Sequence, residues 1–217
     1  MAEPVSPAAH AAFQYEGPAQ QAGTQVSGMW LFLATEVLFF GGLIFTWLFL
    51  RRWHGAGFHA AAQQTDLLIG SVNTALLLLS STAYTWGHRW AARGSNRRLL
   101  HACIVTALLG LAFVVLKGVE WAEDFGKHLW PGAGFTLDTP DPGGARLFFT
   151  FYFVGTALHA VHMMVGVGLV AWIGWRARRG DFTPRYTIPP EIVGLYWSFV
   201  DIVWVTLYPL IYLVDRR

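Results

Sequence analysis

The sequence is poor in charged residues and has almost no cysteine. Only 13% of its 217 residues are charged, whereas soluble domains carry about 25%, so the composition argues against a soluble protein. A single cysteine, Cys103, excludes a disulfide within the chain. The formal net charge of +2 is too small to indicate nucleic-acid binding, and we expect no nucleic-acid partner.

The beginning of the chain also lacks the features of a targeting signal. Residues 1–27 contain neither Lys nor Arg and no apolar run of signal-peptide length. They therefore do not resemble a secretory signal. We expect residues 1–27 to form a polar N-terminal tail and residues 28–217 to form one membrane domain.

Long apolar runs, in contrast, are abundant, and 54% of the residues are hydrophobic. A helix that crosses the roughly 30 Å core of a bilayer needs about 20 mostly apolar residues. Long continuous runs favour helices over the short alternating strands of a barrel. The sequence thus predicts an all-α integral membrane bundle of five transmembrane helices. The predicted spans are about residues 28–50, 67–86, 99–121, 147–172 and 192–214.

Arginines are distributed unequally between the two sides of this predicted bundle. The tail and the second and fourth connections carry more basic residues than the other connections and the C-terminus. Because Lys and Arg are enriched in cytoplasmic loops, we expect the N-terminus in the cytoplasm. Five spans then place the C-terminus outside.

Four ionisable residues lie deep within the predicted spans, where such groups are costly and usually functional. From a rise of 1.5 Å per residue, Glu36 lies about 12 Å, Asp201 about 14 Å and His159 about 12 Å from the cytoplasmic side. His162 lies one turn from His159. We therefore predict a polar layer in which these groups are proton-linked and face the bundle. The alternative is a purely structural role, although interhelical polar contacts contribute only about 0.6 kcal/mol on average.

A metal site is not expected. The spacing of His159 and His162 places both on one face of a helix, where they could hold a metal. Metal sites in bundles draw ligands from several helices, in motifs such as Glu-x-x-His, and this sequence has none. Axial haem ligation needs histidines on facing helices, yet the only other histidine in a span is His101. Lys117 and Glu120, three residues apart, are expected to pair with each other or with lipid headgroups.

Five segments, one in each predicted span, carry a family resemblance. They are ATEVLFFG at 34–41, VNTALLL at 72–78 with TWGH at 85–88, KGVEW at 117–121, LHAVH at 158–162 and YWSFVDIVW at 196–204. In this order they resemble subunit III of the haem–copper respiratory oxidases, of the cytochrome c oxidase type. The resemblance extends over about residues 27–215.

The resemblance implies a role that composition does not. Members of this family pack directly against subunit I of a proton-pumping terminal oxidase, with subunit II in the same complex. They bind structural phospholipid, whereas haem and copper lie in the partner subunits. The chain would be a five-helix form that lacks the first two of seven helices. It would be a non-catalytic subunit that stabilises the catalytic subunit and supports proton uptake. The Ala- and Arg-rich composition, separately, indicates a bacterial plasma membrane.

The resemblance also assigns roles to particular residues. Glu36 matches a buried, carbodiimide-reactive glutamate of the family, with Asp201, His159 and His162 as its expected network. Phospholipid headgroups would be held by basic and aromatic residues at helix ends. The candidates are Lys117, Glu120, Trp86, His88, Arg89 and Trp121.

Two departures from the family pattern leave alternatives open. Ser198 stands where the family usually has His, and Pro189 and Pro190 occupy a segment that often contains another. One alternative is a related subunit of a quinol oxidase or a nitric oxide reductase. An alternative of another class is a small proton-coupled transporter, although the sequence shows neither repeat symmetry nor broken helices.

Overall fold

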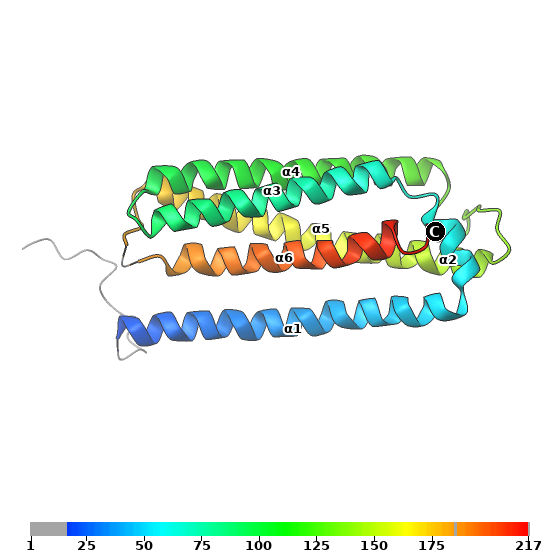
Figure 1. Ribbon diagram of the computed structural model, residues 1–217, viewed down its shortest axis with the longest axis horizontal. Coiled ribbons are helices and arrows are strands. Elements are labelled where there is room, and N and C mark those ends of the chain that lie inside the picture. Colours follow the sequence, from blue (N-terminus) through cyan, green and yellow to red (C-terminus); the bar gives the residue numbers. More distant parts are fainter. Residues whose placement is uncertain (1–16, 185, 217) are drawn as a thin grey trace, which may run out of the picture.

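The computed structural model describes residues 17–184 and 186–216, which form six helices and no strand beyond an isolated bridge between Thr183 and Tyr186. Five of the helices are long and apolar enough to cross a membrane. This confirms the predicted all-α fold with five candidate spans. The helices are α1 (Pro18–Trp53), α2 (Gly55–Ala62), α3 (Leu67–Ala91), α4 (Asn96–Gly126), α5 (Pro142–Arg178) and α6 (Ile188–Tyr212) (Figure 1).

The helix ends differ from the predicted spans where prolines mark them. Helix α1 begins at Pro18, ten residues before the predicted span, because proline fits the first turn of a helix. Residues 18–27 of the expected tail are therefore helical, and residues 1–16 lie outside the described part of the chain. Helix α6 ends at Tyr212, shortly after Pro209, whose carbonyl accepts hydrogen bonds from the amides of Leu213 and Val214.

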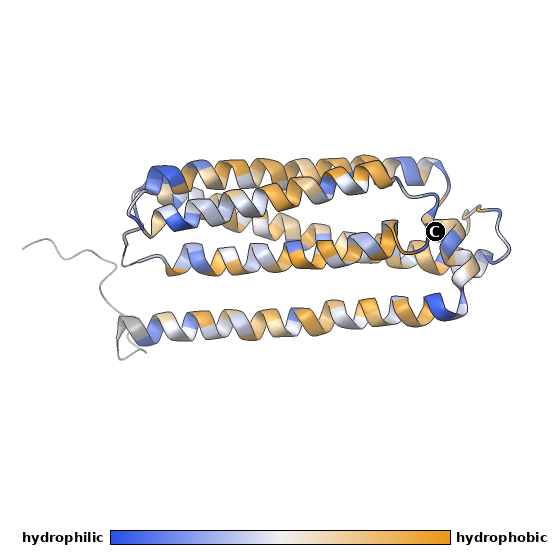
Figure 2. Cartoon of the chain, viewed as in Figure 1, coloured by the Kyte–Doolittle hydropathy of each residue, from blue (hydrophilic) through white to orange (hydrophobic). Residues whose placement is uncertain are grey.

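Helices α3 to α6 form a compact bundle, and α1 lies along one side of it (Figure 1). The contact face of α1 is narrow. Leu33, Phe40 and Trp47, each seven residues after the last, are its only buried large side chains, and Leu43 is half-buried against the same core. This spacing is that of a coiled-coil seam. Between its hydrophilic ends, most of the remaining surface of α1 is apolar (Figure 2), and this surface suits contact with lipid or another membrane chain.

The short helix α2, which the sequence analysis does not predict, closes the end of the bundle where the chain terminates. Its apolar residues Phe58, Ala61 and Ala62 are buried. The ring of Phe58 lies 5.5 Å from that of Trp47 on α1 and 5.6 Å from that of Phe148 on α5. Helix α2 therefore packs between α1 and α5 at this end. We call it the C-terminal end of the bundle, and the opposite end, where α1 begins, the N-terminal end.

Two ion pairs strengthen the same attachment. Arg51 Nε lies 2.7 Å from Asp215 Oδ1, just beyond α6. His54 Nδ1 lies 2.9 Å from Asp141 Oδ2, and Asp141 also accepts the amide hydrogen of Gly144 at the start of α5. The Gly144 amide and the His54 ring together hold the pKa of Asp141 below its usual value. Helix α1 is thus anchored at its C-terminal end.

Candidate functional site

One acid–base pair lies on the seam between α1 and α5. Glu36 occupies the seam position between Leu33 and Phe40, and its Oε2 lies 3.2 Å from Nε2 of His162. The other ring nitrogen of His162, Nδ1, lies 2.8 Å from the carbonyl oxygen of Leu158. Both side chains keep a little under one fifth of their surface exposed (19% and 18%). The structure thus brings together two of the four members of the predicted polar layer, Glu36 and His162.

The hydrogen bonds of His162 determine how this pair holds a proton. A carbonyl oxygen only accepts, so Nδ1 of His162 must carry a hydrogen directed at Leu158. Nε2 is then free either to accept a proton from a neutral Glu36 or to donate one to its carboxylate. In both cases one proton lies between Nε2 and Oε2. The pair can therefore share one proton, whichever of the two groups carries it, with little change in geometry.

Aromatic groups surround the pair on the bundle side. The ring of Phe40 meets that of His162 edge-on at 5.3 Å, and Phe40 also contacts Phe199 of α6. The hydroxyl of Tyr196 donates to the backbone carbonyl of His162 at 3.1 Å. These contacts fix the imidazole ring from behind and leave the carboxyl of Glu36 at the partly exposed edge.

His159, the second histidine of the predicted layer, does not reach Glu36. Its ring is 1% exposed and lies between the rings of Phe113 and Trp204, at 5.3 Å and 5.1 Å. Neither ring nitrogen has a hydrogen-bond partner among the described residues. Residues three apart on a helix differ by about 60° around its axis, which here separates the core from the α1 seam. The two histidines, although neighbours on α5, therefore meet different partners, His159 in the core and His162 at the α1 seam.

Asp201 belongs to a different interface. Its Oδ2 accepts a hydrogen bond from Ser81 on α3, and its Oδ1 has no partner among the described residues. Phe199, two residues earlier, faces α1, and residues two apart lie on roughly opposite sides of a helix. The predicted polar layer is thus divided, with Glu36 and His162 on one side of α6 and Asp201 on the other.

A third group of polar side chains lies inside the C-terminal half of the bundle. Lys117, Glu120 and Asp124 of α4 are each at most 2% exposed. The ammonium of Lys117 donates to Glu120 Oε2 at 3.0 Å, to Tyr152 at 3.1 Å and to Tyr212 at 2.7 Å. Tyr152 lies 3.0 Å from Glu120 Oε1 and 2.7 Å from Asp124 Oδ2, and Tyr212 donates to Glu120 Oε1 at 2.6 Å. We call these five residues the buried charge cluster.

This cluster answers one sequence prediction and reveals what that prediction missed. Lys117 and Glu120 pair with each other, as one of the two alternatives held, and both point into the bundle, away from headgroups. Asp124 was detectable, because it lies seven residues after Lys117 and four after Glu120 on the same face of a helix. The two tyrosines gave no signal, since nothing in their local sequence distinguishes them from other aromatic residues.

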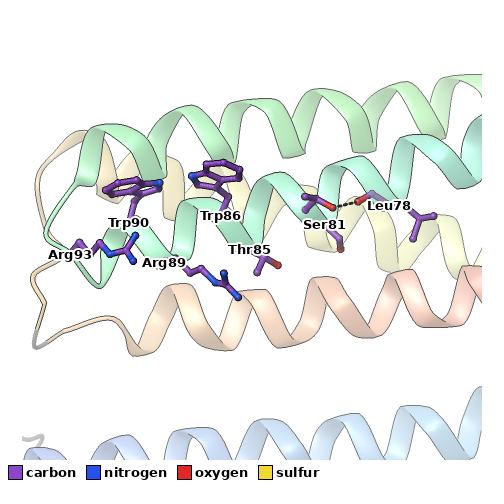
Figure 3. Close-up of a pocket in the computed structure, with 8 residues that line it drawn as sticks. Leu78, Ser81, Thr85, Trp86, Arg89, Trp90 and Arg93 are labelled. Atoms are coloured by element: carbon purple, nitrogen blue, oxygen red, sulfur yellow. Dashed lines mark hydrogen bonds between the residues drawn. The ribbon is translucent and has the colours of Figure 1, made fainter.

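The other lipid candidates lie at opposite ends of the bundle. Trp86, His88 and Arg89 are in the last turns of α3, at the N-terminal end of the bundle. Trp121 lies at the opposite end, with its ring 6.0 Å from that of Phe153. A hollow of about 590 Å³ runs along α3 there (Figure 3). It is lined by Leu78, Ser81, Thr82, Thr85, Trp86, Arg89, Trp90 and Arg93. Trp86 is 65% exposed and lies towards α4, while Arg89 lies towards α6.

Metal-binding geometry is absent from the part of the chain that the structure describes. Among residues 17–184 and 186–216, no three His, Cys, Asp or Glu side chains are grouped so as to hold a metal ion. The contacts of the polar groups described above are hydrogen bonds and ion pairs.

Comparisons with known proteins agree on one family. A family model described as "Cytochrome c oxidase subunit III" matches residues 10–215. Cytochrome c oxidase subunit 3 of Bos taurus is 31% identical over 206 residues, which are 90% of this chain and 71% of the bovine one. The Ovis aries protein matches equally, and that of Balaenoptera musculus is 31% identical over 196 residues, covering 85% and 67% of the two chains. Every polar group described above lies within the matched range.

Proposed function

Since the chain belongs to the cytochrome c oxidase subunit III family, we propose that it is a non-catalytic accessory subunit that supports proton uptake by its partner. It packs against the haem–copper subunit I, beside subunit II, and stabilises that catalytic subunit. Haem and copper belong to the partners, and structural phospholipid covers the remaining faces of the bundle. The contact between Glu36 and His162 is the observation on which the proton-linked role rests.

The position of this pair suits proton exchange better than it suits stabilisation. A carboxyl group in the hydrocarbon region is costly without a partner, and His162 supplies one. The pair is partly exposed on the α1 side, where a partner can reach it, and its single hydrogen bond leaves oxygen Oε1 of Glu36 available to another donor. A group held only for packing would be expected to use both oxygens and to be fully enclosed.

The surface of α1 around Glu36 is suited to a membrane partner. Leu31, Leu38 and Phe45 each expose 70% or more of their surface. Side chains of this kind are disfavoured in water and match either acyl chains or the apolar surface of another membrane subunit. Glu36 thus lies beside a face on which protein or lipid completes the site.

Substitution of Glu36 in the intact oxidase tests the role directly. Glu36→Gln keeps size and hydrogen bonding but removes the exchangeable proton of the acid. We expect normal assembly, measured by co-purification of the haem–copper subunit in mild detergent. Oxygen turnover should fall or decay during continuous turnover, by less than the roughly hundredfold at the low end of what a positioned acid–base group contributes, because the reaction itself takes place in the partner subunit.

Two variants serve as controls. Glu36→Asp retains a carboxyl and should preserve more activity than the glutamine variant. Thr35→Val changes the neighbouring residue, whose hydroxyl bonds only to the carbonyl of Phe32, and should leave turnover unchanged. Unchanged turnover and lifetime in Glu36→Gln at every pH would refute the proton-linked role. Absence of a haem–copper subunit from the purified complex would refute the accessory role itself.

The orientation in the membrane is a further part of the proposal. We place the chain in a bacterial plasma membrane with the N-terminal end of the bundle in the cytoplasm. The connections after α3 and α5, together with the helix ends that flank them, carry eight of the 13 arginines and lie at that end (Figure 1), in accord with the positive-inside rule. Reporter fusions after residue 94 and after residue 133 should report cytoplasmic and external locations, respectively, and the reverse result would invert the topology.

A further inference from the structure

The buried charge cluster has more hydrogen bonds than its ionised form can supply with hydrogens. Its five side chains make six hydrogen bonds with one another. If both carboxyls were ionised, the ammonium of Lys117 would provide three hydrogens and the phenols of Tyr152 and Tyr212 one each. That is one hydrogen too few. The shortage falls on Tyr152, which lies within hydrogen-bond distance of both Glu120 and Asp124 but has a single hydrogen to donate.

The charges of the cluster point to the same deficit. One ammonium faces two carboxyl groups, and all three residues are at most 2% exposed. An uncompensated charge in such a position is expensive, and buried groups give up or take a proton to avoid it. Outside the five residues, Lys127 is the nearest cation along α4, but its side chain is exposed to solvent, where water screens its charge.

We propose that the buried charge cluster is a proton-binding site, with one resident proton on the carboxyl of Asp124. The carboxylic acid donates to the oxygen of Tyr152, and Tyr152 donates in turn to Glu120. All six hydrogen bonds then have a hydrogen, and the cluster is electrically neutral. This site is separate from the Glu36–His162 pair and goes beyond the proposed function.

The distribution of donors assigns the proton to Asp124 and leaves Glu120 ionised. Glu120 receives hydrogen bonds from the ammonium of Lys117 and from both phenols. Such donors favour the charged form of a carboxyl. Asp124 has one neutral phenol as its partner. The proton is therefore held where the negative charge would be least stabilised.

The location makes this proton relevant to how the bundle is held together. Lys117, Glu120 and Asp124 belong to α4, Tyr152 to α5 and Tyr212 to the last residue of α6. Removal of the proton would leave two buried carboxylates on α4 within reach of one phenol. Whether the proton is bound thus affects how α4, α5 and α6 pack at the C-terminal end of the bundle. Asp124 lies there, two residues before α4 ends.

A pair of isosteric substitutions in the assembled oxidase tests the assignment. Asp124→Asn supplies an uncharged group whose amide donates to Tyr152, as the protonated acid does. We expect the midpoint of thermal inactivation to change by no more than about 3 °C. Glu120→Gln leaves the ammonium of Lys117 buried without a carboxylate, and we expect a loss of about 10 °C or failure to assemble.

Infrared spectroscopy supplies a second measurement that does not depend on the fate of the glutamine variant. With aspartate carrying a ¹³C label at its side-chain carboxyl, the carbonyl band of a protonated acid should be present in the unmodified complex and diminished in Asp124→Asn. An unchanged band would overturn the proposal. So would a tolerated Glu120→Gln with a damaged Asp124→Asn, which places the proton on Glu120, or equal damage in both, which means that neither carboxyl is protonated.

Discussion

The buried charge cluster and the Glu36–His162 pair are both acid–base groups within the same bundle, yet they differ in almost every physical respect. The cluster joins three helices, excludes solvent and uses every polar atom of Glu120. The pair joins two helices by one hydrogen bond and stays partly exposed. A saturated group has one stable arrangement, whereas a group with spare acceptors can exchange protons or partners. The comparison therefore assigns stability to the cluster and reactivity to the pair.

The largest effect should come from removing the cation of the cluster. Lys117→Met retains the length of the side chain but leaves the carboxylate of Glu120 buried without its partner. Breaking a buried ion pair in this way costs about 3–5 kcal/mol, so we expect the subunit to fail to accumulate in the membrane or to lose thermal stability strongly. Lys127→Met, which removes an exposed cation immediately after the same helix, is the matched control and should be neutral. Stable accumulation of Lys117→Met would deprive the cluster of its structural role.

Asp201 combines features of the buried charge cluster and of the Glu36–His162 pair. It is buried like the cluster but has one hydrogen-bond donor, Ser81. Ser81→Ala leaves a buried carboxyl without that donor, and such a loss costs about 1–3 kcal/mol. We expect a lower thermal midpoint but no change in the way turnover depends on Glu36, because the two carboxyls lie on opposite sides of α6. Ser198→Ala, at an exposed position of α6, is the control. If Glu36→Gln changed turnover by a different factor in the Ser81→Ala background, the two carboxyls would be functionally coupled, contrary to this expectation.

The contribution of the seam pair to stability should be smaller still. A double-mutant cycle with Glu36→Gln and His162→Asn measures the coupling between the two side chains. Interhelical hydrogen bonds in membranes contribute about 0.6 kcal/mol on average and at most about 1.7, so we expect a coupling in that range. If the pair is reactive and not structural, its substitution should reduce turnover while changing the free energy of unfolding by no more than this coupling. A coupling as large as that of Lys117 with Glu120, measured by the same cycle, would make the pair structural too.

These contrasts also explain which parts of the molecule the sequence predicts. Hydrophobic length predicts five spans, because an apolar run and a bilayer of fixed thickness constrain each other. Residue depth follows from helical rise, and this is why Glu36 and His162 meet as expected. The direction in which a side chain points around its helix depends on which neighbour packs there. That information is tertiary, so the sequence does not predict that Asp201 meets Ser81 on α3 or that His159 lies between Phe113 and Trp204.

The buried charge cluster shows the same limit from the other side. The i and i+3 spacing of Lys117 and Glu120 was sufficient to predict their pairing. Tyr152 and Tyr212 come from helices 35 and 95 residues away from Lys117 in sequence, and no local pattern connects them to it. Helix α2 was missed for a related reason. Its eight residues are too few for a span, and only burial against α1 and α5 explains why they are helical.

The smallest effect is expected at a third acid–base pair, His54 with Asp141, which lies outside the spans at the C-terminal end of the bundle. Their side chains are 37% and 29% exposed, and ion pairs of this kind contribute about 0–1 kcal/mol.

Asp141 has a pKa lowered chiefly by the amide of Gly144 and then by His54. A carboxyl whose pKa is depressed in the folded state adds stability that is fully present above its unfolded value, about 3.9, and is lost as the pH falls through the folded value. Acidification below about pH 4 should therefore remove this contribution in the unmodified subunit, whereas Asp141→Asn should show no such loss, because its side-chain oxygen still caps α5 and cannot titrate. Thermal midpoints of the two proteins between pH 3 and pH 7 would measure the difference. Equal acid sensitivity would mean that the cap on α5, and not the charge of Asp141, determines how this end of α1 is attached. Burial would then fail to predict the relative electrostatic contributions of the buried charge cluster, the Glu36–His162 pair and the His54–Asp141 pair.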